Sequence, residues 1–189
     1  MKKYELTAEF IEQWGKKLFR IKALISFGSV EVGELGGYVE KEDNLAQDGD
    51  AWVCDDAWVC GNARVYGDAE VCDDARVCGN ARVYGDAEVY GDAEVCDDAE
   101  VYGNADYLLI GRIGSRFSFT TFFKNKDKGI TVSCGCFLGT IAEFRAKVTD
   151  THGNNKHAKI YNLAADMAEL QILGEEHFNK LNTNKSEPF

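Results

Sequence analysis

A pattern of six residues repeats without interruption through residues 53–106. The nine copies read VCDDAW, VCGNAR, VYGDAE, VCDDAR, VCGNAR, VYGDAE, VYGDAE, VCDDAE and VYGNAD. Each alanine and the valine two positions after it would point to the same face of an extended strand. Glycine or aspartate, followed by aspartate or asparagine, is typical of a tight turn. Each hexad therefore predicts a short strand and a corner, and these corners exclude a helix.

Short strands joined by regular corners are typical of the hexapeptide parallel β-helix. The pattern resembles the left-handed β-helix of the hexapeptide-repeat superfamily, the trimeric-transferase-like solenoids, in which three hexads make one triangular coil. The resemblance implies that equivalent residues of successive coils stack about 4.8 Å apart. The expected outward stacks are a tyrosine ladder, a cysteine ladder and an acidic corner: Tyr66, Tyr84, Tyr102; Cys60, Cys78, Cys96; Asp55, Asp56, Asp73, Asp74, Asp92.

The hydrophobic pattern before the hexads predicts a cap and a less regular coil. Residues 1–26 predict an N-terminal β-hairpin cap, with strands over residues 4–6 and 18–25 and a connection that can hold a helical turn. Residues 27–52 keep a weaker six-residue phase and are rich in glycine, which predicts a degenerate coil. The phase fades after residue 106, so the β-helix is expected to cover residues 27–114 in four to five coils.

The pattern after the coils changes and predicts a small ββαα cap domain over residues 115–178. Residues 117–136 alternate and predict a hairpin. Thr140 and Glu143 form a capping box that predicts a helix, and a second helix is expected over residues 156–173. Residues 179–189 are polar and predict a mobile tail. The expected fold class is an all-β solenoid with an N-terminal hairpin cap and this C-terminal cap domain.

The charge of the chain is concentrated in the coils. The chain carries a formal net charge of −11, and residues 35–106 contain 19 acidic and 4 basic side chains. Such a rod repels nucleic acid and attracts basic surfaces. The sequence has neither a signal peptide nor an apolar run that could span a membrane. We therefore expect a cytoplasmic protein whose seven cysteines stay reduced.

The segments outside the hexads carry a second resemblance. KKYELT, LFRIKAL, FGSVEVGELGGYVEKEDNLAQDG and GRIGSR…TTFF…VSCGCFLGT are similar to bacteriophage and prophage solenoid proteins of unassigned activity. The resemblance covers the whole chain and is specific as architecture. It implies a viral or prophage origin and a location in the cytoplasm of a bacterial host cell. It does not indicate a substrate.

Enzymatic chemistry is the first alternative to weigh. Many left-handed β-helices are acyltransferases, and acyl transfer needs a general base, usually histidine. The first histidine of the chain is His152, and the hexads lack loop insertions, so a structural rod is favoured over an active or degenerate acyltransferase. If the chain were such an enzyme, only His152, His157 or His177 could act as the base. The missing coil histidines also argue against a zinc site like that of γ-class carbonic anhydrases.

Metal and small-ligand sites are weaker alternatives. Cys134, Cys136, His152 and His157 suit zinc by type, but the C-x-C spacing is tighter than in usual zinc motifs, so no metal or other cofactor is expected. The acidic corner could bind a hard cation, although solvated carboxylates are favoured. A third functional hypothesis is a sponge for a small signalling nucleotide, whose phosphates would contact basic residues of the C-terminal cap: Arg112, Arg116, Lys124, Lys126 and Lys128.

Binding of another macromolecule is the function that the sequence favours. Outward aromatic side chains mark interfaces, unless the N-terminal cap covers them. Related β-helices are often trimers, so self-association is also expected. The leading hypothesis is a non-enzymatic acidic solenoid that occupies the basic surface of a host protein, such as a nuclease or defence system that it inhibits, without contacting nucleic acid or membrane. The expected interface residues are Trp52, Trp58, Tyr66, Tyr84, Tyr102, Asp56, Asp74, Asp92, Glu70, Glu88 and Glu94.

Overall fold

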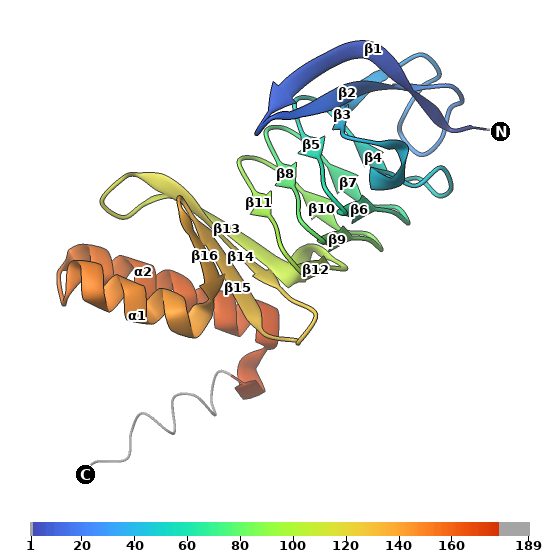
Figure 1. The fold of residues 1–189 in the computed structure, drawn as a ribbon. Helices are drawn as coiled ribbons and strands as arrows, with labels where there is room; N and C mark the ends of the chain where they lie inside the picture. Colours follow the sequence, from blue (N-terminus) through green and yellow to red (C-terminus); the bar gives the residue numbers. More distant parts are fainter. Residues whose placement is uncertain (1, 178–189) are drawn as a thin grey trace. The chain divides into compact units, whose positions relative to one another are not determined.

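The chain folds into two compact units, residues 1–104 and 105–189 (Figure 1). A computed structural model describes residues 2–177. The first unit contains an N-terminal hairpin and the coils of a β-solenoid, and the second contains a four-stranded sheet and two helices. The predicted fold class is therefore confirmed in its main features: a β-solenoid with strands before it and a small helical region after it.

Each regular hexad contributes a strand of two residues whose second member is valine. The strands form three parallel sheets, in the orders β4-β7-β10, β5-β8-β11 and β6-β9-β12. The valine of every hexad and the alanine of the first eight are fully buried and form the core of the coils. Because strands of the same sheet come from successive coils, the 18-residue stacking is confirmed. The strands are β4 Trp52–Val53, β5 Trp58–Val59, β6 Arg64–Val65, β7 Glu70–Val71, β8 Arg76–Val77, β9 Arg82–Val83, β10 Glu88–Val89, β11 Glu94–Val95 and β12 Glu100–Val101.

The corner after each strand from β4 to β11 contains a residue in the left-handed backbone conformation. Most corners use glycine, as at Gly79 with φ of 67°, but Asp55, Asp73 and Asp97 adopt φ of 53°, 59° and 57°. A side chain is strained in this region, and aspartate tolerates it better than most residues. Asp55 and Asp73 also accept hydrogen bonds from the backbone N–H of the next coil, from Asp73 at 3.3 Å and from Gly91 at 3.0 Å. These aspartates therefore hold one coil against the next.

The N-terminal cap is a longer hairpin than the sequence indicates. Strands β1 (Tyr4–Gln13) and β2 (Lys16–Ala23) pair almost throughout, so the connection expected between residues 6 and 18 is wrong. The hairpin closes on Trp14 and Gly15, both at positive φ. Two consecutive residues at positive φ match the twist of paired strands, and a tryptophan gives no sign of this conformation in a sequence.

The hairpin continues directly into one face of the solenoid. Strand β3 (Leu35–Val39) pairs antiparallel with β2 and parallel with β5, which gives a six-stranded sheet in the order β1-β2-β3-β5-β8-β11. The short helix η1 (Glu42–Asn44) follows, and the buried Asn44 amide donates to the carbonyl of Ala63 at 2.8 Å. Leu45 then bridges in parallel to Val65. The expected degenerate coil is thus present, and the solenoid has about four coils.

The second unit begins earlier than the sequence indicates, at residue 105 within the short helix η2 (Asn104–Asp106). Strand β13 (Tyr107–Ile113) was expected to continue the solenoid to residue 114, but it pairs antiparallel with β14 (Ser118–Lys124). Residues 107–113 lack the turn dipeptide that a corner needs, so the chain stays extended. The sheet order is β13-β14-β15-β16, completed by β15 (Ile130–Cys134) and β16 (Phe137–Thr140).

Two helices pack on this sheet. The predicted capping box starts α1 (Ile141–His152), since the Thr140 hydroxyl accepts from the Glu143 N–H and the Glu143 carboxylate accepts from the Thr140 N–H. Helix α2 (Lys156–Ala168) continues into the π-helical turn η3 (Glu169–Leu173). Phe122, Val132 and Phe144 are among the side chains of the shared core. None of the described helices is long and apolar enough to cross a membrane. The predicted tail, residues 179–189, lies outside the described part of the chain.

The cysteines of the solenoid differ from the expectation that they stay reduced. Cys54 is bonded to Cys72 and Cys78 to Cys96, each across a Cα–Cα distance of 4.7 Å. The parallel register places both partners at the same position of neighbouring coils, which is within the range that a disulfide spans. Cys60, Cys134 and Cys136 are free thiols.

Candidate functional site

The most acidic corner of the solenoid lies between the sheets β4-β7-β10 and β5-β8-β11. We call this corner the acidic edge. All of its carboxylates are exposed, and Arg20 approaches it with its guanidinium 3.7 Å from the Asp56 carboxylate. The other two corners hold glycine and asparagine at several of the equivalent positions. The acidic edge consists of Asp55, Asp56, Asp73, Asp74 and Asp92.

The acidic edge sits on a rigid support. The alanines and valines beneath it are fully buried, and backbone hydrogen bonds join each coil to the next, as from Cys54 to Val71 at 2.9 Å. Neighbouring carboxylates repeat at the coil spacing of roughly 4.8 Å. Because such like charges repel, pairing them with cationic side chains of another molecule would be favourable. The fixed spacing makes the edge an ordered row of acceptors.

The glutamates named from the sequence are less exposed than these aspartates, except for Glu88. Glu70 is half-buried and accepts a hydrogen bond from the Tyr90 hydroxyl at 3.1 Å. Glu88 is exposed, and its carboxylate accepts from the Asn104 amide at 3.3 Å. Glu94 is half-buried and stands in register with Arg76 of the neighbouring strand. These side chains enlarge the acidic surface, but hydrogen bonds within the chain already engage the carboxylates of Glu70 and Glu88.

The two tryptophans do not form an exposed interface. Trp52 is 3% exposed and packs against the rings of Tyr4 and Phe27, and Trp58 is 6% exposed and forms a T-shaped pair with Trp14. The expectation that they bind a partner is therefore wrong for this structure, because the N-terminal hairpin covers them. Their large apolar surfaces fix the cap to the first coil instead.

The tyrosine ladder forms as predicted and borders a face of mixed charge. The rings of Tyr66 and Tyr84 stack with centroids 5.0 Å apart, and Tyr102 meets Tyr84 edge-on at 5.1 Å. Arg64 and Arg82 lie beside the ladder and line a groove with Tyr66 and Asp48. This face carries two guanidinium groups close together. A basic partner is therefore expected to bind at the acidic edge rather than at the ladder.

Among residues 2–177, the structure does not bring the ligands proposed from the sequence together into a metal site. The only group of three potential ligands with atoms within 4.8 Å of one another in this range is Cys54, Asp55 and Cys72, whose two sulfurs are joined in a disulfide. Only three of the four residues of the zinc hypothesis share a site. Cys134, Cys136 and His152 line one cavity of the second unit, and His157 is not part of its wall.

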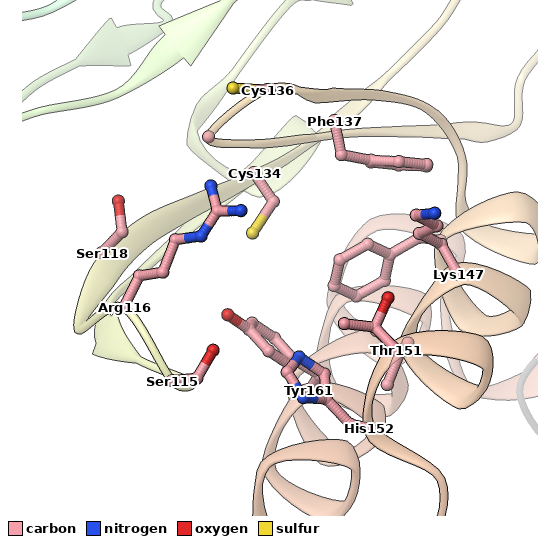
Figure 2. Close-up of a pocket in the computed structure, with 13 residues that line it drawn as sticks. Ser115, Arg116, Ser118, Cys134, Cys136, Phe137, Lys147, Thr151, His152 and Tyr161 are labelled. Carbon is pink, nitrogen blue, oxygen red and sulfur yellow. The ribbon is translucent and has the colours of Figure 1, made fainter.

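That cavity has a volume of about 280 Å³ and lies between the turns of the sheet and the helices α1 and α2 (Figure 2). Phe137, Phe144 and Val148 give it an apolar floor, and Arg116 and Tyr161 provide polar groups. Sequence reasoning named Arg116, Cys134 and His152 separately and missed the cavity, because nothing in the sequence indicates that the two turns and two helices converge.

The basic residues of the nucleotide hypothesis do not gather around the cavity. Arg116 lines it, but the Arg112 guanidinium lies over the ring of Phe119 at 5.7 Å. The Lys124 ammonium forms an ion pair with Asp106 at 2.7 Å. Of the histidines considered as a general base, His152 lines the cavity and stacks on Tyr161 at 5.8 Å.

Comparison with known families supports the repeat architecture. The family model described as YdcK Beta solenoid repeat matches residues 57–73 and 75–91. These segments include strands and corners of the three sheets. The first unit is a β-solenoid. Comparison with curated proteins gave no match for the chain.

Proposed function

We propose that the protein is a non-enzymatic binding module whose acidic edge occupies a basic surface of another protein. The observation that supports this best is the row of five exposed aspartates at one corner of a rigid solenoid. A row of fixed charges loses little conformational entropy on binding, so electrostatic complementarity is converted into association. The partner in this proposal is a bacterial protein that uses the same basic surface to bind nucleic acid, such as a nuclease or a defence protein.

The proposal includes the setting that the sequence resemblance implies. The chain would be encoded by a phage or prophage and act in the bacterial cytoplasm, and its solenoid would assemble into a trimer like other hexapeptide-repeat proteins. Trimerisation would multiply the number of acidic edges and so raise the avidity for a multivalent partner. Sedimentation equilibrium measures the oligomer directly, and a monomer at micromolar concentration would remove this part of the proposal.

A pair of matched triple variants tests the acidic edge. The edge variant carries D56N, D74N and D92N, and the control variant carries E5Q, E12Q and D127N, which neutralise exposed carboxylates elsewhere. Both variants lose the same net charge, so they differ only in where it is lost. We expect the tagged wild-type chain to capture a protein from bacterial lysate at low salt, the control variant to retain it, and the edge variant to bind it at least roughly tenfold more weakly.

Salt concentration provides the second readout of the same experiment. Electrostatic attraction between exposed groups is screened as ionic strength rises, so the captured protein should elute at moderate salt. Mass spectrometry identifies the protein, and purified components then give the dissociation constant for each variant. Equal weakening by both triple variants, or binding that does not respond to salt, would show that the edge is not the binding surface.

A further inference from the structure

The cavity of the second unit differs in charge from the rest of the chain. Its wall contains Arg116, Lys147 and His152, and none of the 13 described residues that line it is acidic. The chain as a whole has a net charge of −11. A concave wall that combines basic side chains with an apolar floor is a typical site for a small anion that carries a hydrophobic body. This cavity is independent of the acidic edge and of its proposed partner.

The polar groups converge on one side of the cavity. Figure 2 shows the Arg116 guanidinium, the Cys134 thiol and the Tyr161 hydroxyl close together, whereas Phe137 and Thr151 lie on the other side and the Cys136 sulfur points away. Burial raises the pKa of the Tyr161 hydroxyl to about 12, and the neighbouring Cys134 acts in the same direction. The hydroxyl therefore stays protonated at neutral pH, so it can donate a hydrogen bond to an anion beside the guanidinium.

The local backbone fixes the position of Tyr161. Gly114, at φ of 73°, lies so close that a Cβ atom there would come 1.8 Å from the Tyr161 hydroxyl oxygen. The tyrosine ring also stacks on His152 and meets Phe144 edge-on, each with ring centroids within 5.8 Å. A donor held on three sides is preorganised, which lowers the entropy lost when a ligand binds.

We propose that this cavity binds a small carboxylate whose body is a single aromatic ring. The Arg116 fork would hold the carboxylate, the Tyr161 hydroxyl would donate to it, and the ring would pack on Phe137, Phe144 and Val148. A volume of about 280 Å³ lies at the lower end of ligand cavities and suits one ring better than a nucleotide. Lys147 stands on the rim, where it pairs with Asp150 at 3.6 Å, and would add to the attraction of the anion.

The test uses the full chain and 4-fluorobenzoate, whose binding is measured by fluorine NMR. We expect a dissociation constant of roughly 0.1–1 mM for so small a ligand. R116Q should weaken binding at least about tenfold, because it removes the charge-assisted hydrogen bonds. The matched control is R112Q, an exposed arginine outside the cavity wall, which should bind like the wild type. T151F, at an exposed helical position on the wall, should fill the cavity and abolish binding.

Two related probes decide the class of ligand. The neutral 4-fluorobenzyl alcohol should bind far more weakly than 4-fluorobenzoate. The affinity of 4-fluorophenyl phosphate should not exceed that of 4-fluorobenzoate. Amide spectra of each variant show whether the second unit remains folded. The proposal is overturned if 4-fluorobenzoate does not bind, if R116Q leaves its affinity unchanged, if the alcohol binds equally well, or if the phosphate binds more tightly.

Discussion

Replacing Gly37 by alanine should destabilise the first unit by about 3 kcal/mol or more. Gly37 lies in β3, where the N-terminal cap joins the first coil, and it is buried. An added Cβ atom would come 2.4 Å from the carbonyl oxygen of Ala57 and 2.8 Å from a methyl group of Val53. The carbonyl belongs to the backbone of a hydrogen-bonded coil, so it cannot move aside without separating β3 from its neighbours.

Tryptophan fluorescence during urea unfolding measures this effect in the correct unit, because the three tryptophans Trp14, Trp52 and Trp58 all belong to it. G103A is the control, since Gly103 has an ordinary φ and no heavy atom within 4 Å of its Cβ position. We expect G103A to unfold within about 0.5 kcal/mol of the wild type. A G37A protein as stable as G103A would mean that β3 does not pack against the coil as described.

The second large effect is an increase in the stability of the first unit between pH 7 and pH 9.5 that depends on Lys3. Lys3 is 2% exposed, and its ammonium donates to the carbonyl of Ala51 at 2.8 Å. Burial lowers the pKa of Lys3 from 10.5 to about 8, although the nearby Asp48, Asp50 and Asp68 oppose this shift. The cap thus holds a cation whose charge is costly in the folded state.

The sign of the effect follows from the protons that each state binds. Below about pH 8 the folded and unfolded chains both carry the proton, so the cost of the buried charge is present in full. Between pH 8 and 10.5 the unfolded chain binds more protons at Lys3 than the folded chain, so stability rises with pH. We expect a gain of about 2 kcal/mol at pH 9.5, relative to K3M.

The comparison with K3M removes the contributions of other groups. Burial raises the pKa values of Tyr4 and Cys60, so these groups lower stability at high pH, in the opposite direction to Lys3. Both are present in the wild type and in K3M, and the difference between the two proteins isolates Lys3. The free energies of unfolding are measured in urea at pH 7 and 9.5. A difference between wild type and K3M that is the same at both values would refute the buried cation.

The coils were predictable because one short pattern determines both the direction in which each side chain points and the register of neighbouring strands. Ala75 and Val77 recur every six residues, so the same two inward positions are filled in every strand. Gly79 and Asp73 occupy equivalent corners because both residue types tolerate a positive φ. The capping box at Thr140 could also be predicted from the sequence, since it depends on residues only three positions apart.

The remaining features depend on contacts that are distant in the sequence. The pattern shows that Trp52 points outward from the coil, but not that Phe27 and Tyr4 cover it. Strand β13 was assigned to the solenoid because the six-residue repeat continues weakly through it. The local pattern does not show that this strand pairs with β14 instead. The cavity brings Arg116 beside Tyr161, 45 positions away, and neither residue carries a local signal of this proximity. Sequence patterns predicted the scaffold, and tertiary packing decided the surfaces.

A competition experiment tests the central claim that the acidic edge occupies a nucleic-acid-binding surface. The captured partner is bound to a fluorescent DNA duplex, and the chain is then added while the anisotropy of the duplex is followed. The account predicts that the anisotropy falls to the value of free DNA, and that the triple variant D56N, D74N and D92N requires roughly tenfold more protein for the same decrease. A further rise in anisotropy, which indicates a ternary complex of DNA, partner and chain, would contradict it.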